Sequence, residues 1–152
     1  MKRKQVTGIL PSSGKIYFNS IDLKSTIAHK IVLRNWIIAT IIEEGFTPGD
    51  ISFNFCSDEY LLEINRTYLN HDYYTDIITF ELNEGKYIMG DVYISMDRVK
   101  ENAKDMHLTY QTELHRVIIH GILHLCGYKD KGKKDATLMR GKEDYYLSLL
   151  AI

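Results

Sequence analysis

Two histidines, His120 and His124, are the residues in this chain whose spacing is best suited to chemistry, and they fall in a segment typical of a helix. Positions four apart stack on one face of an α-helix, so both imidazoles can reach a single ion. Gly127 can adopt the left-handed conformation that ends a helix, and the turn could bring Asp130 to the same ion. Two histidines and a carboxylate leave a coordination position for water, as catalytic zinc sites do. The sequence therefore predicts one zinc ion per chain.

A pair of histidines four apart also occurs on helices that bind no metal, and here the glycine turn and Asp130 favour the metal site. Zinc peptidases carry a glutamate directly after the first histidine, where it acts as general base. Gly121 occupies that position and has no side chain to accept a proton. A zinc peptidase or amidase is therefore the less favoured interpretation.

The helix expected over residues 110–126 is apolar on most sides, and such a helix is normally buried. Buried imidazoles need oxygen partners for the nitrogens that do not bind the ion. Glu113 and Arg116 precede His120 on nearly the same face, and a surface ion pair near the helix start is their simplest interpretation. The functional alternative is that Arg116 holds a phosphate near the metal. Glu113 would lie about 10 Å from His120 along the axis, too far for a general base.

The chain becomes basic after the loop that is expected to carry the metal ligand Asp130. The basic residues that would form the rim of the site are Lys129, Lys131, Lys133, Lys134, Arg140 and Lys142. Of these, Lys131, Lys133 and Lys134 are the candidates for substrate binding. A positive rim beside an activated water suits a polyanionic substrate better than a peptide. Tyrosines could stack on unpaired bases at such a rim. The candidates are Tyr73, Tyr74 and Tyr128, although most of the 11 tyrosines are expected to be packed.

The composition is that of an ordinary soluble protein with one domain. The chain has 152 residues, of which 45% are hydrophobic and 26% charged. No apolar run approaches the roughly 20 residues that span a membrane. Two cysteines are too few for a secreted disulfide scaffold, so a cytoplasmic location is expected. The net charge of −1 does not indicate a general nucleic-acid binder, and no DNA or membrane partner is expected.

The pattern of elements predicts a single α+β domain in residues 16–152, after a polar tail in residues 1–15. Strands are expected over residues 16–18, 51–56, 76–82 and 88–95. Helices are expected over residues 23–44, 58–68, 97–106, 110–126 and 134–150. Because the elements do not alternate strictly, a small mixed sheet packed with helices is favoured over a doubly wound fold.

Five segments resemble one known family, and the first along the chain is residues 62–68, with Asn65 and Tyr68. Residues 120–128, His-Gly-Ile-Leu-His-Leu-Cys-Gly-Tyr, closely resemble the core of the YbeY family of metal-dependent endoribonucleases. Residues 75–80 are similar to its Thr-Asp-Val-Leu-Ser-Phe motif, and residues 90–95 to its Gly-Asp-Ile-x-Ile-Ser motif. Met139 and Glu143 match its Met-x-x-x-Glu pattern in the last helix. Together these segments are far more specific than the histidine pair alone.

The resemblance implies a compact α+β fold with a zinc ion in a cleft. It also implies cleavage of single-stranded RNA during ribosomal RNA maturation and ribosome quality control, with the small ribosomal subunit as partner. The alternative is a non-enzymatic ribosome assembly factor that uses zinc only for stability. Intact metal ligands without RNA cleavage would favour that alternative.

The chain departs from the family pattern at two positions. Asp130 stands where the family usually has a third histidine, and a carboxylate is also a competent zinc ligand. Leu69 stands where the family usually has an arginine thought to act in catalysis. Arg66 or Arg116 is expected to supply the missing positive charge, with Arg116 favoured because it shares the histidine face of its helix.

Overall fold

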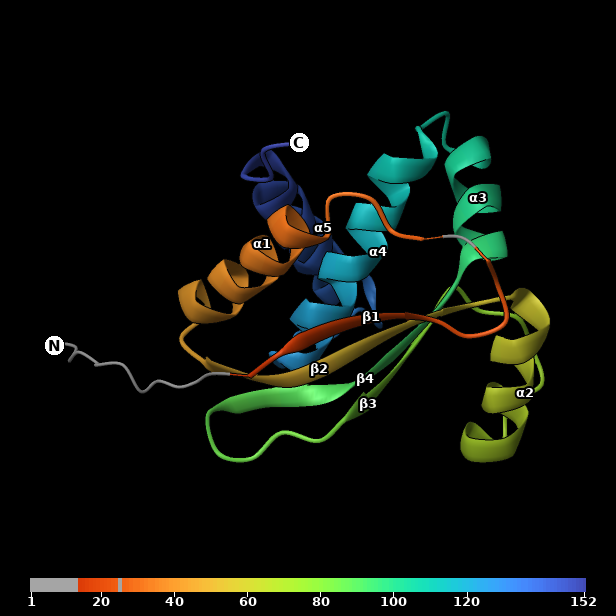
Figure 1. Ribbon diagram of the computed structural model, residues 1–152, viewed down its shortest axis with the longest axis horizontal. Coiled ribbons are helices and arrows are strands. Elements are labelled where there is room, and N and C mark those ends of the chain that lie inside the picture. Colours follow the sequence, from red (N-terminus) through yellow and green to blue (C-terminus); the bar gives the residue numbers. More distant parts are fainter. Residues whose placement is uncertain (1–13, 25) are drawn as a thin grey trace, which may run out of the picture.

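A four-stranded sheet in the order β1-β2-β4-β3 forms the centre of the computed structural model, which describes residues 14–24 and 26–152 (Figure 1). The strands are β1 (Ile16–Ser20), β2 (Thr47–Cys56), β3 (Ile77–Glu81) and β4 (Tyr87–Ser95). Strand β2 pairs in parallel with both β1 and β4, whereas β3 pairs antiparallel with β4. The predicted mixed sheet in an α+β fold is therefore confirmed.

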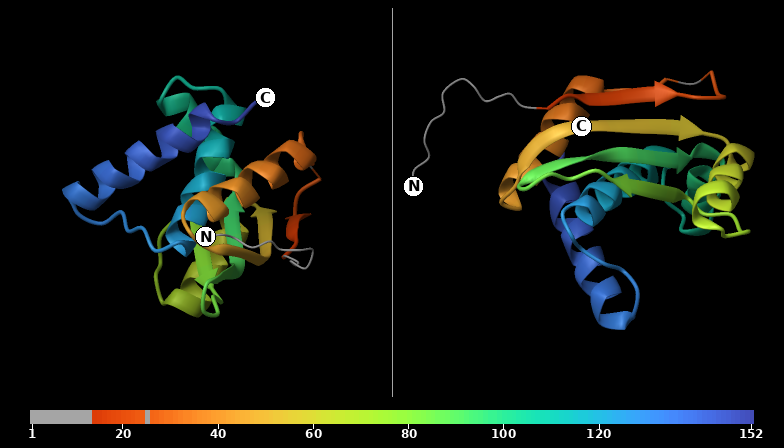
Figure 2. Two further views of the ribbon diagram at one scale, coloured as in Figure 1. Left: turned by 90° about the vertical axis from the view of Figure 1, so that its left-hand side faces the viewer. Right: turned by 90° about the horizontal axis from the view of Figure 1, so that it is seen from below.

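Helices pack mainly on one face of this sheet. The helices are α1 (Lys30–Glu43), α2 (Asp58–Leu69), α3 (Met96–Asp105), α4 (Tyr110–Leu125) and α5 (Lys133–Ser148). Figure 1 shows α1, α4 and α5 above the sheet and α2 at the opposite face near the ends of the strands. Figure 2 shows the N-terminal end of α5 projecting beyond the sheet. The arrangement leaves α4 between the sheet and α5.

Helix α4 is the central element of the core. Thr109 begins it as a cap, because its hydroxyl accepts a hydrogen bond of 3.1 Å from the backbone N–H of Thr112. Apolar side chains then bury most of its circumference. The buried apolar residues are Leu114, Val117, Ile118, Ile119, Ile122, Leu123 and Leu125. The prediction of a buried helix capped by Thr109 is confirmed.

The helix predicted over residues 23–44 is wrong in its first part, because α1 begins only at Lys30. His29 precedes it with a left-handed φ of 61° and makes no side-chain cap. Ile27 is buried in the core although it lies outside any helix. The position of Ile27 in the sequence fits the spacing of apolar residues in a helix, but its side chain reaches the core from a segment that is not helical. Strand β2 begins at Thr47, four residues before the start predicted at residue 51, and the remaining predicted elements lie within two residues of their expected bounds.

The start of the described chain is attached to the sheet. Gly14 donates a backbone hydrogen bond to Pro48, and the backbone N–H of Ile51 donates to Lys15. Of the tail predicted over residues 1–15, positions 1–13 lie outside the described residues. Among the residues that the structure describes, no helix is both long and apolar enough to cross a membrane.

Candidate metal centre

His120 and His124 lie one turn apart in the C-terminal half of α4. Their ring centroids are 4.4 Å apart and the ring planes are perpendicular. The side chains are 19% and 26% exposed, respectively, while the helix around them is buried. The core therefore fixes the two imidazoles and leaves part of each ring open to a ligand.

The turn after α4 brings a carboxylate to both imidazoles. Gly127 adopts a φ of 108°, and the backbone N–H of Tyr128 donates to the carbonyl of Leu123 at 3.0 Å. As a result, Asp130 Oδ2 lies 3.3 Å from His120 Nε2 and 3.4 Å from His124 Nε2. The three ligand atoms all lie within 4.8 Å of one another. The structure thus brings together the three residues that the sequence selected as metal ligands.

The spacing of these atoms fits a metal ion. In a tetrahedral zinc site with bonds of about 2.0–2.1 Å, ligand atoms lie about 3.3–3.4 Å apart. The two distances from Asp130 Oδ2 to the imidazole nitrogens match this separation. Two imidazole nitrogens and one carboxylate oxygen are also a donor set that divalent transition metals accept. The group could therefore hold a metal ion.

Each imidazole is oriented by an oxygen on its other nitrogen. His120 Nδ1 lies 2.6 Å from Glu143 Oε2, and His124 Nδ1 lies 2.9 Å from the carbonyl oxygen of Tyr128. Because these oxygens accept hydrogen bonds, each Nδ1 donates and each Nε2 keeps its lone pair for a metal. The sequence predicted such oxygen partners but did not identify them.

Negative charge surrounds His120. Burial lowers the pKa of His120, but the hydrogen bond and charge of Glu143, together with Asp130 and Asp76, raise that pKa above its ordinary value. The same field of negative charge favours a cation at Nε2. The charges around this site and the spacing of its ligand atoms therefore both favour a metal cation.

Arg116 is engaged by carboxylates inside the protein. Its Nη1 donates to Glu143 Oε1 and to Asp144 Oδ1, each at 3.1 Å, and its Nε lies 3.8 Å from Glu113 Oε1. Glu113 is buried, which raises the pKa of its carboxyl group. The interpretation of Glu113 and Arg116 as a surface ion pair is therefore wrong. Helix α5 covers this part of α4 and supplies two of the carboxylates.

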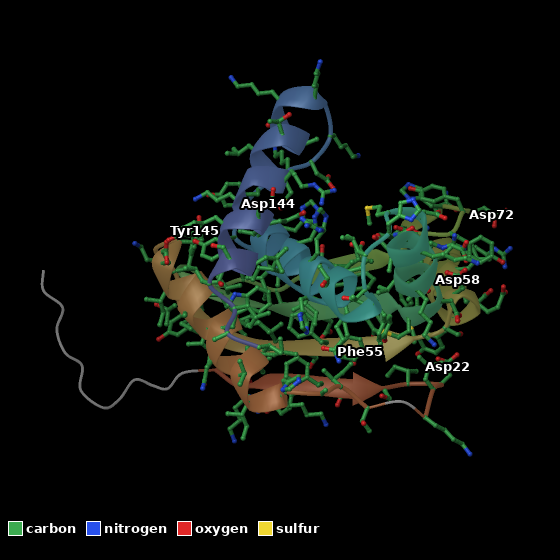
Figure 3. The ribbon with its side chains drawn as sticks, turned by 90° about the horizontal axis from the view of Figure 1, so that it is seen from above. Asp22, Phe55, Asp58, Asp72, Asp144 and Tyr145 are labelled. Carbon is green, nitrogen blue, oxygen red and sulfur yellow. The ribbon has the colours of Figure 1, made fainter. Side chains whose placement is uncertain are left out.

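Arg66 lies on α2, away from the carboxylates that surround Arg116. Its Nε donates to Asp72 Oδ1 at 2.6 Å, and its Nη1 lies 3.3 Å from Glu63 Oε1, at a half-exposed position on α2. Figure 3 shows Asp144, the partner of Arg116, beside α5, and Asp72, the partner of Arg66, far from it on the other side of the molecule. The two arginines proposed from the sequence therefore do not converge on one point.

A small pocket beside His120 contains Asp76, which sequence reasoning did not select, and Arg140, which it placed only in the basic rim. It has a volume of about 140 Å³, and its charged and imidazole side chains are Asp76, Glu113, Arg116, His120, Arg140 and Glu143. Burial raises the pKa of Asp76 above its ordinary value. Asp76 lies in one of the segments that resemble the YbeY family, and Arg140 lies between two residues of another. The resemblance of those segments to the family was the sequence feature that could have marked both residues as part of the site.

The predicted basic rim is exposed. Lys131 lies in the loop after Asp130, and Lys133 and Lys134 lie in the first turn of α5. All three side chains are open to solvent, so they are accessible to a polyanion. None of them is buried in the core that fixes the metal ligands.

The tyrosines considered for base stacking have other contacts. Tyr128 donates a hydrogen bond of 2.7 Å to Glu44 Oε1, and the Lys142 ammonium lies 5.5 Å from its ring centroid. Glu44 also accepts hydrogen bonds from Tyr146 and Lys142, so it joins α1 to the ligand loop and to α5. These contacts fix the loop that carries Asp130.

Tyr73 and Tyr74 lie in the loop between α2 and β3. The Tyr73 hydroxyl lies 2.9 Å from His71 Nδ1, and the Tyr74 hydroxyl donates to Glu59 at 2.7 Å. Both tyrosine rings are about half exposed. Exposed rings can accept a stacking base, but neither of these tyrosines is in the pocket beside His120.

Gly121, which follows the first histidine, packs against the sheet. A Cβ at this position would lie 3.0 Å from Ile77 Cδ1 and 3.2 Å from Val92 Cγ1. The position that carries the general base in zinc peptidases therefore faces strands β3 and β4 here. In the same motif, burial raises the pKa of Cys126 to about 12, so its thiol stays protonated.

Comparisons with known proteins identify the family of this chain. The sequence model of the family described as Endoribonuclease YbeY matches residues 19–151. Endoribonuclease YbeY of Flavobacterium psychrophilum is 52% identical over 118 residues, which cover 78% of this chain and 84% of that protein. The Parabacteroides distasonis protein of the same name is 49% identical over 135 residues, covering 89% of this chain and 95% of that one.

A solved structure has the same fold. The solution structure of TM1509 from Thermotoga maritima superposes with a TM-score of 0.58 at 28% sequence identity, and the match covers 90% of this chain and 89% of that one. The family model, the close relatives and this structural match all extend over most of the chain. The chain belongs to the YbeY family of endoribonucleases.

Proposed function

We propose that this protein is a zinc-dependent endoribonuclease that cleaves single-stranded RNA, with its activity in residues 16–152. The observation that carries the proposal is the position of Asp130 Oδ2, 3.3 and 3.4 Å from the Nε2 atoms of His120 and His124. The three side chains remain partly exposed, as a site that must admit water and a phosphate requires. Membership of the YbeY family supports the reaction class.

The residues of the site have separate roles in this proposal. When bound, zinc lowers the pKa of a water to about 7 and polarises a phosphoryl oxygen. His120, His124 and Asp130 hold the ion. Glu143 and the carbonyl of Tyr128 keep the two rings in the required tautomer and orientation.

The proposed substrate is ribosomal RNA during its maturation and during ribosome quality control in the cytoplasm, with the small ribosomal subunit as partner. Lys131, Lys133 and Lys134 would contact phosphates that flank the cleaved bond. Exposed lysines contact phosphates through charge and do not read base identity. Their accessibility beside the ligand loop supports a polyanionic substrate.

A cleavage assay on end-labelled RNA tests this proposal. The protein is treated with a chelator, dialysed, and returned to activity with stoichiometric zinc. Cleavage of a single-stranded RNA should disappear with the metal and return with it, and the matching duplex should be cleaved more slowly.

Two results would contradict the proposal. Zinc-loaded protein that leaves all single-stranded RNAs intact but sediments with small ribosomal subunits would favour a non-enzymatic assembly factor with a structural zinc. Zinc-dependent hydrolysis of casein would favour a peptidase.

Asp130 offers a specific test of the ligand set. Asp130→Ala should weaken zinc binding, because it removes the one carboxylate of the site, whereas Asp130→His should retain binding because imidazole is also a zinc ligand. Competition with a chromogenic chelator measures both affinities. Unchanged affinity in Asp130→Ala would place the third ligand elsewhere.

Glu143 should control zinc affinity without touching the ion. Glu143→Gln removes the charge that accepts the hydrogen bond from His120 Nδ1, and loss of such a partner costs about 10–100-fold in metal affinity. Asp144→Asn is the matched control. Asp144 also contacts Arg116, but it is exposed and, within residues 14–24 and 26–152, makes no hydrogen bond or ion pair with His120. Equal zinc affinities for the two variants would exclude this role of Glu143.

A further inference from the structure

The pocket beside His120 is large enough for one phosphate group. Its volume is about 140 Å³, and it combines side chains from α4 and α5 with Asp76, which directly precedes β3. A water occupies about 30 Å³ in the liquid, so the pocket holds roughly four or five waters. An anion in this pocket would lie next to one of the proposed metal ligands.

Two arginines line the pocket, and they differ in how their charge is used. Arg116 is mostly buried, with 15% of its side chain exposed, and it has Glu143, Asp144 and Glu113 around its guanidinium. Through Glu143, which contacts His120 Nδ1, Arg116 is connected to the metal ligand. Its charge is therefore balanced within the protein, and its contacts are those of a residue that positions Glu143.

Arg140 is the more accessible of the two. Its side chain is 54% exposed, and its Nη1 lies 3.6 Å from Glu143 Oε1, beyond the length of a good hydrogen bond. Glu143 Oε1 is already bonded to Arg116, and Glu143 Oε2 to His120. A guanidinium has five N–H donors arranged as a fork that fits phosphate oxygens. In residues 14–24 and 26–152, the structure gives Arg140 no hydrogen bond that would use these donors.

Arg140 also extends the basic rim toward the pocket. Lys133 lies seven residues earlier on α5, which places the two side chains on the same side of the helix, about 10 Å apart along its axis. A polyanion that follows this side of α5 from Lys133 would reach the pocket at Arg140.

We propose that Arg140 contacts the phosphate that undergoes cleavage and stabilises its negative charge, and that Arg116 is a positioning residue that acts through Glu143. This inference rests on the proposed endoribonuclease function. It names the residue of this chain that supplies the positive charge beyond the metal.

Single-turnover cleavage of a single-stranded RNA by the zinc-loaded protein tests the inference. Arg140→Ala should lower the cleavage rate about 100-fold, because a donor to the developing charge is lost. The cleavage rate of Arg140→Lys should lie between those of wild type and Arg140→Ala, because lysine keeps the positive charge but lacks the forked donors of a guanidinium. Lys104→Ala, which removes an exposed cation from α3, is the control and should cleave at the wild-type rate. The zinc content of the Arg140 and Lys104 variants should equal that of wild type.

Binding gives a readout that does not depend on catalysis. For a 2′-O-methyl RNA oligomer that resists cleavage, loss of one phosphate contact reduces the slope of log K against log salt by about 0.7. Arg140→Ala should show this change, and Lys104→Ala should keep the wild-type slope. Arg116→Ala should instead lower zinc affinity, because its effect passes through Glu143 and His120.

The outcomes separate this inference from the proposed function. If wild type cleaves RNA with zinc while Arg140→Ala has the same rate and the same salt slope, Arg140 makes no phosphate contact and the inference fails alone. If wild type shows no zinc-dependent cleavage, both proposals fail together. A normal salt slope with a reduced rate and reduced zinc content would place Arg140 among the residues that support the metal ligands, which also overturns the inference.

Discussion

Replacement of His124 by alanine is expected to remove bound zinc and to lower zinc-dependent RNA cleavage by about 1,000-fold. Two ligands would remain, His120 and Asp130, and they cannot complete a three-ligand site. The rate effect follows because metal assistance contributes several kcal/mol to transition-state stabilisation. Zinc content by elemental analysis and the single-turnover rate on the same preparation measure the two effects. His124 is partly exposed, so its loss should leave the fold intact.

His71→Ala is a suitable control for this prediction. His71 lies in the exposed loop between α2 and β3 and contacts Tyr73. It should keep one zinc per chain. A His124→Ala variant that also keeps one zinc at wild-type affinity would show that the metal binds elsewhere.

A leucine at position 121 is expected to destabilise the protein by about 3 kcal/mol or more. The first added carbon would already lie 3.0 Å from Ile77 Cδ1 and 3.2 Å from Val92 Cγ1, and the rest of the side chain would have to displace α4 from the sheet. Inserting side-chain volume into a packed core costs about 1–3 kcal/mol and sometimes more, and leucine adds four carbons here. Urea denaturation followed by circular dichroism measures the change in the free energy of unfolding.

Gly141→Leu is the matched control, because Gly141 also lies within a helix but a Cβ there would meet nothing within 4 Å. Leucine is the better helix former by roughly 0.5–1 kcal/mol, so this variant should be as stable as wild type or slightly more stable. If both leucine variants were equally stable, the close packing of α4 against β3 and β4 would not be a constraint on this fold.

The parts of the site that could be predicted from sequence are local. His120 and His124 share a helical face, Gly127 turns the chain, and Asp130 follows within three residues, so helix periodicity and one turn are enough to bring them together. The helix cap at Thr109 was predicted correctly for the same reason, because it depends only on the next few residues. Short-range geometry of this kind is contained in the spacing of the residues.

The parts that could not be predicted depend on packing between distant segments. From their spacing in the sequence, Glu113 and Arg116 resemble an ion pair on the surface. In the folded protein, α5 packs against them and places Glu143 and Asp144 beside Arg116. The start of α1 was predicted too early because Ile27 fills a core position from an irregular segment, and helical spacing alone does not distinguish that case. The pocket that contains Asp76 and Arg140 likewise exists only after β3, α4 and α5 meet.

The contact between His120 and Glu143 has a consequence for synthesis of the chain. All three proposed ligands precede α5 in the sequence, whereas the carboxylate that orients His120 lies within α5. During translation the ligands are therefore synthesised before their support, and domains acquire stable structure only as their segments become available. Tight metal uptake should follow the docking of α5 onto α4. A nascent protein of this design would remain without its full catalytic site until its own synthesis had passed Glu143.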